Sequence, residues 1–437
     1  MTVSTALRLL AAAILLALGM AGAYERFSSL QGWRWPWWWY NHVVEMGRPA
    51  PPEAVWCVRA GWTALAVIVV CSGLRWWRGA GLKFDRCDWI ILTLPAWLLF
   101  TGFWLGLPRP LIHIGLWPQV AVLLLYFLGR STGLELRGWS AACIFVAAVL
   151  AVTVLLDAEG LMHRAPQRPG GLLASRNFAG QYLALTLPAL LVWGWRIEAT
   201  RRHGLRVLYA ACAVLIGVAL VLTRSRTAWI GASVGTVFIL VFACAPRRLV
   251  VLPLAFVMMG ALIGGYLPTK LVWKDAHPFW TSASRIFDIS SGSGAFRRDQ
   301  YRDTLRIAAS HPVLGVGPAG WSKAIAAVNP DPQHHYNHFP NSDYLRFLCE
   351  GGFVGLALFI GVGTVFLHRA WKLRREQPQV FATLAALGLI CASDAVFVRA
   401  EASALLCALL AALVNHSTRL SPPQNSPSLT DCAAIGL

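Results

Sequence analysis

FRRDQYRDTLRIAASHPVLGVGPAGW (Phe296–Trp321), followed after a spacer by HHYNHFPNSDYLRFLCEGGFVGL (His334–Leu356), holds most of the polar chemistry of a strongly apolar chain. The sequence becomes a long apolar helix just after Asp343. The cationic and imidazole side chains of this stretch are Arg297, Arg298, Arg302, Arg306, His311, His334, His335 and His338. Guanidinium groups bind phosphate oxygens in pairs, so a cationic segment that leads directly into a membrane span indicates a surface site for an anionic substrate.

The composition is typical of a membrane protein. Of the 437 residues, 57% are hydrophobic and 13% are charged, against roughly 25% charged residues in soluble domains. Apolar runs of roughly 17 to 22 residues recur along the chain, and each is long enough to cross a hydrocarbon core of about 30 Å. We therefore expect an all-α polytopic membrane protein.

The basic loops predict the topology. About twelve spans with both termini in the cytoplasm would place the strongly basic short loops on one side of the membrane. The resulting divisions are residues 1–267 with nine spans, 268–342 as one large periplasmic loop with short helices, 343–420 with three spans, and 421–437 as a disordered Pro/Ser-rich cytoplasmic tail.

Charge and cysteine content exclude several classes. The net charge is +18, but no soluble basic domain is expected that would hold nucleic acid. The ten cysteines show no CxxC spacing, and the large loop contains none, so neither a disulfide framework nor a zinc site is indicated. The absence of a Walker motif argues against an ATP-driven pump.

Arginines at the expected outer face are candidate ligands for an anion. Cations at that depth are costly to desolvate unless they are paired or functional, and we expect arginines from separate hairpins to converge on a pyrophosphate. The alternative is that these side chains reach toward lipid headgroups. The residues concerned are Arg176, Arg224, Arg226, Arg297, Arg298, Arg302 and Arg306.

The histidines supply candidate general bases. His338 is the first candidate because it lies just before the span that begins near Asp343. For His334 and His335 the alternative interpretation is that they are solvated loop residues without a catalytic role. His311 precedes Pro312 at an expected helix end, where it has the alternative of binding terminal carbonyl groups. No carboxylate pattern supports a metal site among these histidines.

Four stretches in this order resemble the O-antigen ligase/polymerase superfamily of bacterial envelope glycosyltransferases. They are SRNFAGQYLALTLP, LTRSRTAWIGASVG, RRDQYRDTLRIAASHPVLGVGPAGW and HFPNSDYLRFLCEGGFVGL. The resemblance covers roughly residues 175 to 355. The positions that match the family motifs are Asn177, Ser225, Arg226, Arg297 and Tyr301.

The resemblance implies a GT-C-like fold and glycan transfer from undecaprenyl pyrophosphate without a nucleotide, metal or other cofactor. It implies His338 as the base and Arg226 and Arg297 as pyrophosphate ligands. Many members place His directly before the Asn of the last motif, where this chain has Pro340, so His335 remains an alternative base. Further pyrophosphate-ligand candidates are Arg176, Arg224 and Arg298, and secondary candidates are His311, Asn341 and Arg302.

The expected acceptor is lipid A–core, which would make the protein an O-antigen ligase of the bacterial inner membrane with its site facing the periplasm. The arginine-rich outer face and the lack of a large soluble C-terminal domain favour this over an O-antigen polymerase or a protein O-oligosaccharyltransferase. Expected partners are the lipid-linked glycan, lipid A–core and membrane lipids. A non-catalytic lipid-linked glycan transporter would instead show internal repeats or paired broken helices.

Overall fold

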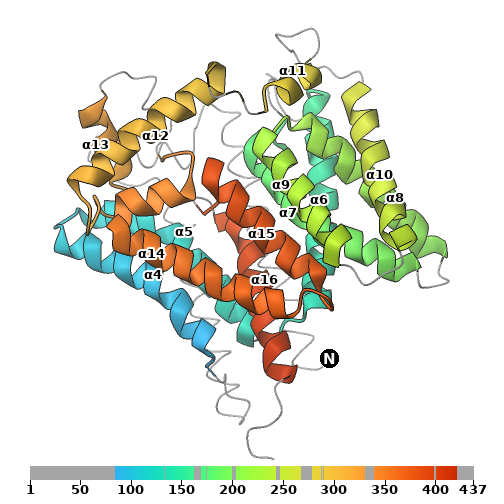
Figure 1. Cartoon of the computed structure of the whole chain (residues 1–437), viewed down its shortest axis with the longest axis horizontal. Helices are drawn as coiled ribbons and strands as arrows, with labels where there is room; N and C mark the ends of the chain where they lie inside the picture. The colour runs from blue at the N-terminus through green and yellow to red at the C-terminus, as the bar shows by residue number, and fades with distance from the viewer. Residues whose placement is uncertain are drawn as a thin grey trace, which may run out of the picture.

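The structure is a computed structural model that describes residues 84–420 apart from 132, 162–168, 174, 199–202, 243–246, 267–277, 287, 289, 330–338 and 398–399. Within these residues the chain forms helices and turns and contains no strand (Figure 1). The all-helical expectation is therefore confirmed for this part of the chain.

A helix lies at the place of each span expected from residue 87 onward. The helices are α4 Arg86–Trp104, α5 Arg109–Ser131, α6 Leu136–Ala158, η2 Gly171–Leu173, α7 Arg176–Glu198, α8 His203–Leu222, α9 Arg226–Phe242, α10 Arg247–Tyr266, α11 Pro278–Ser284, α12 Gly292–Ser310, α13 Trp321–Val328, α14 Asp343–Lys372, α15 Pro378–Ser393 and α16 Ala400–Leu420. The first two expected spans, residues 5–23 and 54–73, and the tail 421–437 lie outside the described residues.

Four of these helices, α4, α6, α8 and α14, are long and apolar enough to cross a membrane. Shorter apolar helices lie in α9, α10, α15 and α16. These helices show a multi-pass helical membrane protein, while the number of twelve spans and the GT-C-like arrangement stay predictions.

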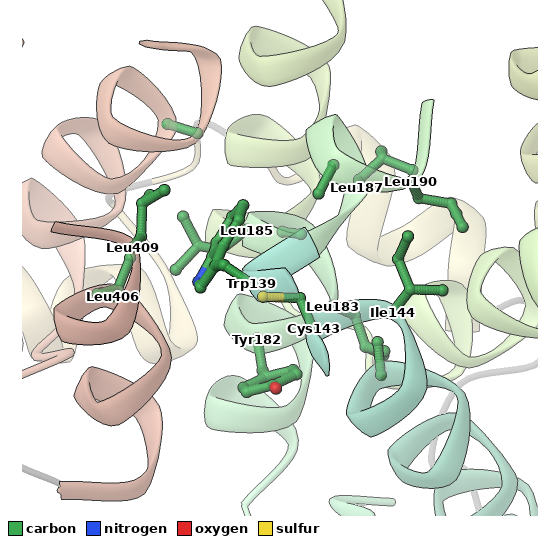
Figure 2. Close-up of a cluster of buried hydrophobic side chains, with 14 of the residues drawn as sticks. Trp139, Cys143, Ile144, Tyr182, Leu183, Leu185, Leu187, Leu190, Leu406 and Leu409 are labelled. Carbon is green, nitrogen blue, oxygen red and sulfur yellow. The ribbon is translucent and has the colours of Figure 1, made fainter. Parts of the chain in front are cut away.

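Helix α7 forms the centre of the helix bundle. Its side chains are buried from Phe178 to Val192, and such a helix, apolar on all sides, lies inside a bundle rather than at its surface. Figure 2 shows Leu185 of α7 beside Trp139 of α6, with Leu406 and Leu409 of α16 on the other side. The bundle therefore holds the first turn of α7, where Arg176 lies, in a fixed position.

Small residues allow α8 and α10 to pack backbone against backbone. A Cβ atom added at Gly260 would lie 2.0 Å from the Val214 carbonyl oxygen, and one at Gly217 would lie 2.3 Å from the Val257 carbonyl oxygen. Gly260 and Gly264 have the GxxxG spacing that brings membrane helices close together.

A buried polar network joins α4, α5 and α16 at one end of the bundle. Arg130 donates from Nε and Nη2 to the two carboxylate oxygens of Asp88, at 2.8 and 2.9 Å. The Tyr126 hydroxyl donates to Asp88 at 2.6 Å, and Arg130 also donates to Asn415. These contacts satisfy charges that would be costly to bury alone.

Asp85 and Arg369 form a second ion pair at this end, with two hydrogen bonds of 2.8 and 2.9 Å. Because Asp85 caps the start of α4 and Arg369 lies in the last turn of α14, the two helices run antiparallel. Helices α11, α12 and α13 lie at the opposite end, at the top of Figure 1.

Helix α14 is broken, whereas the sequence predicted one continuous span over 343–367. Gly352 interrupts it with φ +66°, a conformation that favours glycine. The loop HPVLGVGP binds the carbonyl groups around the break: Val316 N–H donates to Cys349 at 2.8 Å and Gly317 N–H to Glu350 at 2.9 Å. The break thus joins two of the sequence stretches that resemble the ligase superfamily.

Candidate functional site

The hairpin between α8 and α9 presents two arginines on either side of a buried serine. Arg224 has φ +49°, a left-handed conformation that is uncommon for a residue with a Cβ atom. Ser225 is buried, and a Cβ atom at Gly180 of α7 would lie 2.8 Å from Ser225 Cβ. The hairpin therefore packs directly on α7, with Arg226 as the first residue of α9.

Both hairpin arginines contact the segment that leads to α12. Arg224 Nε donates to Ser282 Oγ at 2.9 Å. Arg226 donates to the Arg285 carbonyl oxygen and, at 2.6 Å, to Ser293 Oγ. The Asp288 carboxylate offsets part of the positive charge of Arg226. A phosphate would still be a stronger acceptor for this guanidinium group than the neutral oxygens that it contacts here.

Arg297 of α12 points into the bundle and faces Asp394. Its Nη2 atom lies 3.6 Å from Asp394 Oδ2, and the side chains are 21% and 4% exposed. Asp394 directly follows α15 and also interacts electrostatically with Arg176. A buried carboxylate thus holds two of the predicted arginine ligands near one point.

Arg226 belongs to the same group of charges. It interacts electrostatically with Arg297, with the Asp288 carboxylate and with Arg285. Ser393 Oγ donates to Thr227 Oγ1 at 3.2 Å, which ties the end of α15 to the first turn of α9. Like charges repel unless an anion lies between them. The arginines of α7 and α12 interact with one carboxylate, and the arginine of α9 interacts with that of α12. Together they form a cationic site suited to an anion.

Gln300 and Tyr301 connect this arginine group to Asn341. Gln300 Oε1 accepts hydrogen bonds from the backbone N–H and the side-chain amide of Asn341, at 2.9 and 3.0 Å. The Tyr301 hydroxyl donates to the Asn341 carbonyl oxygen at 2.6 Å. Burial raises the pKa of Tyr301 to about 12, so this hydroxyl is a hydrogen-bond donor and not a base near neutral pH.

The start of α7 is also fixed by a carboxylate. Asp157, at the end of α6, accepts hydrogen bonds from the backbone N–H groups of Gly170 and Gly171, at 2.9 and 3.2 Å. These contacts hold the turn that precedes Arg176.

Other predicted site residues lie elsewhere. Arg298 and Arg302 are exposed on the outer side of α12. His311 caps the far end of α12, where its N–H donates to the Ile307 and Ala308 carbonyl oxygens and its ring nitrogen Nδ1 lies 3.0 Å from Ser310 Oγ. The two carbonyl contacts are made by the backbone N–H, and the ring nitrogen Nδ1 also lies 3.3 Å from the Ile307 carbonyl oxygen, which is compatible with the carbonyl-binding alternative for His311.

His334, His335 and His338 lie outside the described residues, so the predicted base is not placed. Within the part of the chain that is described, no group of three His, Cys, Asp or Glu side chains could hold a metal ion.

Sequence reasoning missed Asp394, Gln300 and Gln181. Gln181 is fully buried in α7 and interacts with Asp394, and neither of its amide atoms has a partner with hydrogen-bond geometry among the residues that the structure describes. The available signal was a carboxylate in the apolar stretch around residues 380–398, because ionisable groups in spans mark functional sites. For Gln181 the corresponding signal was a polar side chain within the apolar stretch that forms α7.

The comparisons with known proteins show which family part of the chain resembles. Residues 211–360 match the family model Wzy_C, described as O-antigen ligase. The matched segment contains both hairpin arginines, all of α12 and the docked loop, whereas Arg176 and Asp394 lie outside it. No curated protein matches the chain. Over this segment the chain is similar to the O-antigen ligase family.

Proposed function

We propose that the protein is an O-antigen ligase that transfers a glycan from undecaprenyl pyrophosphate to a hydroxyl group of lipid A–core. The observation that carries this proposal is that Arg297 faces the buried Asp394 and also interacts electrostatically with Arg226, which comes from a different element. Guanidinium forks match the paired oxygens of a pyrophosphate. The family match supports the class of reaction.

The transfer would be a metal-independent displacement with inversion. The acceptor hydroxyl oxygen attacks the anomeric carbon while His338 takes the hydroxyl proton. The bond between the anomeric carbon and the phosphate oxygen breaks, and its electron pair stays on the pyrophosphate. Arg226 and Arg297 would stabilise the charge that grows there, as hydrogen-bond donors do at an oxyanion.

Chain geometry is compatible with this role for His338. Asn341 is held by Gln300 and Tyr301, one turn from Arg297. Residue 338 is three positions before Asn341, and three residues of chain span at most about 11 Å. His335, at twice that separation along the chain, stays the alternative base.

The short basic loops support a topology with the site in the periplasm and both termini in the cytoplasm, and the family match supports a location in the bacterial inner membrane. Helices α11 to α13 lie at one end of the bundle (Figure 1). Arg130, Arg369 and the basic residues after α14 lie at the other end, which contains the Asp85–Arg369 ion pair. Positively charged loops favour the cytoplasmic side.

Purified protein in nanodiscs, with a defined lipid-linked glycan and lipid A–core, provides the test. We expect wild-type transfer without added metal and a loss of about 10² to 10⁴ in rate for His338→Ala. Near-normal transfer by that variant would reject the base assignment. Glycan joined to another glycan instead of lipid A–core would identify a polymerase, and glycan joined to protein would identify a protein O-oligosaccharyltransferase.

A further inference from the structure

Helix α12 has two polar faces with different surroundings. Arg297 and Gln300 face the bundle, together with the buried residues Thr304 and Ile307. Adjacent residues of an α-helix project about 100° apart, and Arg298 is accordingly exposed. The arginines of this helix therefore belong to two sites and not to one.

The exposed face carries a regular row of cations. Arg298, Arg302 and Arg306 are spaced four residues apart and all are exposed, so they form one stripe about 12 Å long. Leu305 lies between Arg302 and Arg306 along the helix and is 50% exposed. The stripe, defined by these four residues, thus combines positive charge with an apolar side chain.

The ion pairs within the stripe are weak competitors for an incoming phosphate. Arg298 pairs with Asp299 at 3.1 Å, with both side chains more than one-third exposed. Arg306 lies 3.1 Å from Asp303, whose carboxylate is buried and also accepts a hydrogen bond from Asn329. Arg302 makes no ion pair with any residue that the structure describes. Solvent-exposed ion pairs contribute little, so a phosphate with two charges can replace them.

We propose that the Arg298–Arg302–Leu305–Arg306 stripe binds the phosphate groups of the acceptor, an anionic phosphorylated glycolipid. This inference rests on the proposed function. The three guanidinium groups match phosphates spread over a headgroup. Leu305 could contact the apolar part of an amphiphile, whereas a soluble anion has no apolar part to contact it. Helix α12 then separates the two substrates, with the donor pyrophosphate at its inner Arg297 and the acceptor phosphates at its outer stripe.

The experiment compares the full-length protein with the triple variant Arg298→Gln/Arg302→Gln/Arg306→Gln in nanodiscs of neutral lipid. Arg375→Gln is the matched control, because Arg375 is exposed just beyond α14 at the opposite end of the bundle. Transfer is measured with the phosphorylated acceptor and with the same acceptor after removal of its phosphates. Thermal unfolding and size-exclusion profiles of all variants report on folding.

We expect the triple variant to raise the KM for the phosphorylated acceptor about 10- to 30-fold, because it removes three ion pairs that each contribute modestly to binding. The KM for the donor, and transfer to the dephosphorylated acceptor, should stay within about twofold of wild type, and Arg375→Gln should match wild type throughout. An unchanged acceptor KM, or an equal loss with both acceptors, would overturn the proposal.

A direct binding measurement separates this inference from the proposed function. A fluorescent phosphorylated glycolipid is titrated into the detergent-solubilised protein, with phosphatidylglycerol as the competing occupant. Weaker glycolipid binding by the triple variant supports the stripe even if wild type transfers no glycan, in which case only the proposed function fails. Equal displacement by phosphatidylglycerol would show a bilayer-lipid contact and overturn the acceptor assignment.

Discussion

At the scale of single residues, Asp394 decides how the arginines are arranged. It is buried, lies 3.6 Å from Arg297 and interacts with Arg176. Removing one partner of a buried ion pair leaves the other charge uncompensated. The partial exposure of Arg297 reduces this cost, so we expect the main effect on the orientation of the guanidinium group and not on folding.

Asp394→Asn should lower kcat by about 10- to 100-fold, corresponding to about 1.4 to 2.7 kcal/mol of transition-state stabilisation. The KM for the donor should stay the same or fall, because the site gains positive charge. Steady-state kinetics with varied donor provide the measurement. The control is Asp299→Asn, which removes a partly exposed carboxylate two residues after Arg297 on α12 and should leave kcat at the wild-type value. An unchanged kcat for Asp394→Asn would exclude a positioning role for Asp394.

Tyr301→Phe tests a neutral hydrogen bond. Loss of the bond to the Asn341 carbonyl oxygen should cost about 1 kcal/mol and lower the transfer rate about fivefold. The pKa of Tyr301 is about 12 in the folded protein and about 10 in the unfolded chain. The protonated hydroxyl therefore contributes its full stabilisation below pH 10, and this stabilisation is lost as the pH rises through 12. The pH–rate profile of the variant between about pH 5 and 9 should therefore keep the wild-type shape; a shifted profile would make Tyr301 a titrating group.

At the scale of elements, the break in α14 depends on one glycine. A Cβ atom at Gly352 would lie 2.0 Å from the Val313 carbonyl oxygen, and its φ of +66° disfavours other residues. Gly352→Ala should destabilise the protein by about 2 to 4 kcal/mol from strain and overlap together, lowering the unfolding temperature and releasing the HPVLGVGP loop. Gly361→Ala in the same helix has open space and should be neutral or stabilising; equal effects would refute the docked loop.

The contact between α8 and α10 allows a second matched comparison. Gly260→Ala should cost about 1 to 3 kcal/mol, because its Cβ atom would force the two backbones apart. Gly265→Ala, with nothing within 4 Å of the added atom, should be neutral or slightly stabilising through helix propensity. Thermal unfolding in detergent measures both, and identical unfolding temperatures would exclude close backbone packing at Gly260.

The same elements show what the sequence can predict. The apolar run that follows Arg226 predicts a span that begins there, in agreement with the helix Arg226–Phe242. The break at Gly352 was missed because it depends on carbonyl partners in a separate loop. Asp394 was missed for a related reason: no local pattern shows that it meets Arg297, far earlier in the chain.

At the scale of the whole molecule, the arrangement of charge relates the site to the membrane. One end holds α11, α12 and α13 (Figure 1), and Arg297 of α12 belongs to the cationic site. The other holds the Asp85–Arg369 ion pair and the basic turn after α14. The sequence predicted these two sides from loop charge, and the helix order keeps them apart in space.

The topology can be tested by cysteine labelling at two exposed positions outside the proposed sites, Ala309→Cys on α12 and Glu376→Cys after α14. A membrane-impermeant maleimide should label Ala309→Cys from the periplasmic side of intact cells with a permeabilised outer membrane. It should label Glu376→Cys only after the inner membrane is opened, because positively charged loops stay in the cytoplasm. The background is a variant in which Cys57, Cys71, Cys212, Cys244 and Cys432 are replaced, because the other five cysteines are buried. Labelling of Glu376→Cys in intact cells, with Ala309→Cys protected, would place the arginine site in the cytoplasm, where a periplasmic glycan transfer could not occur.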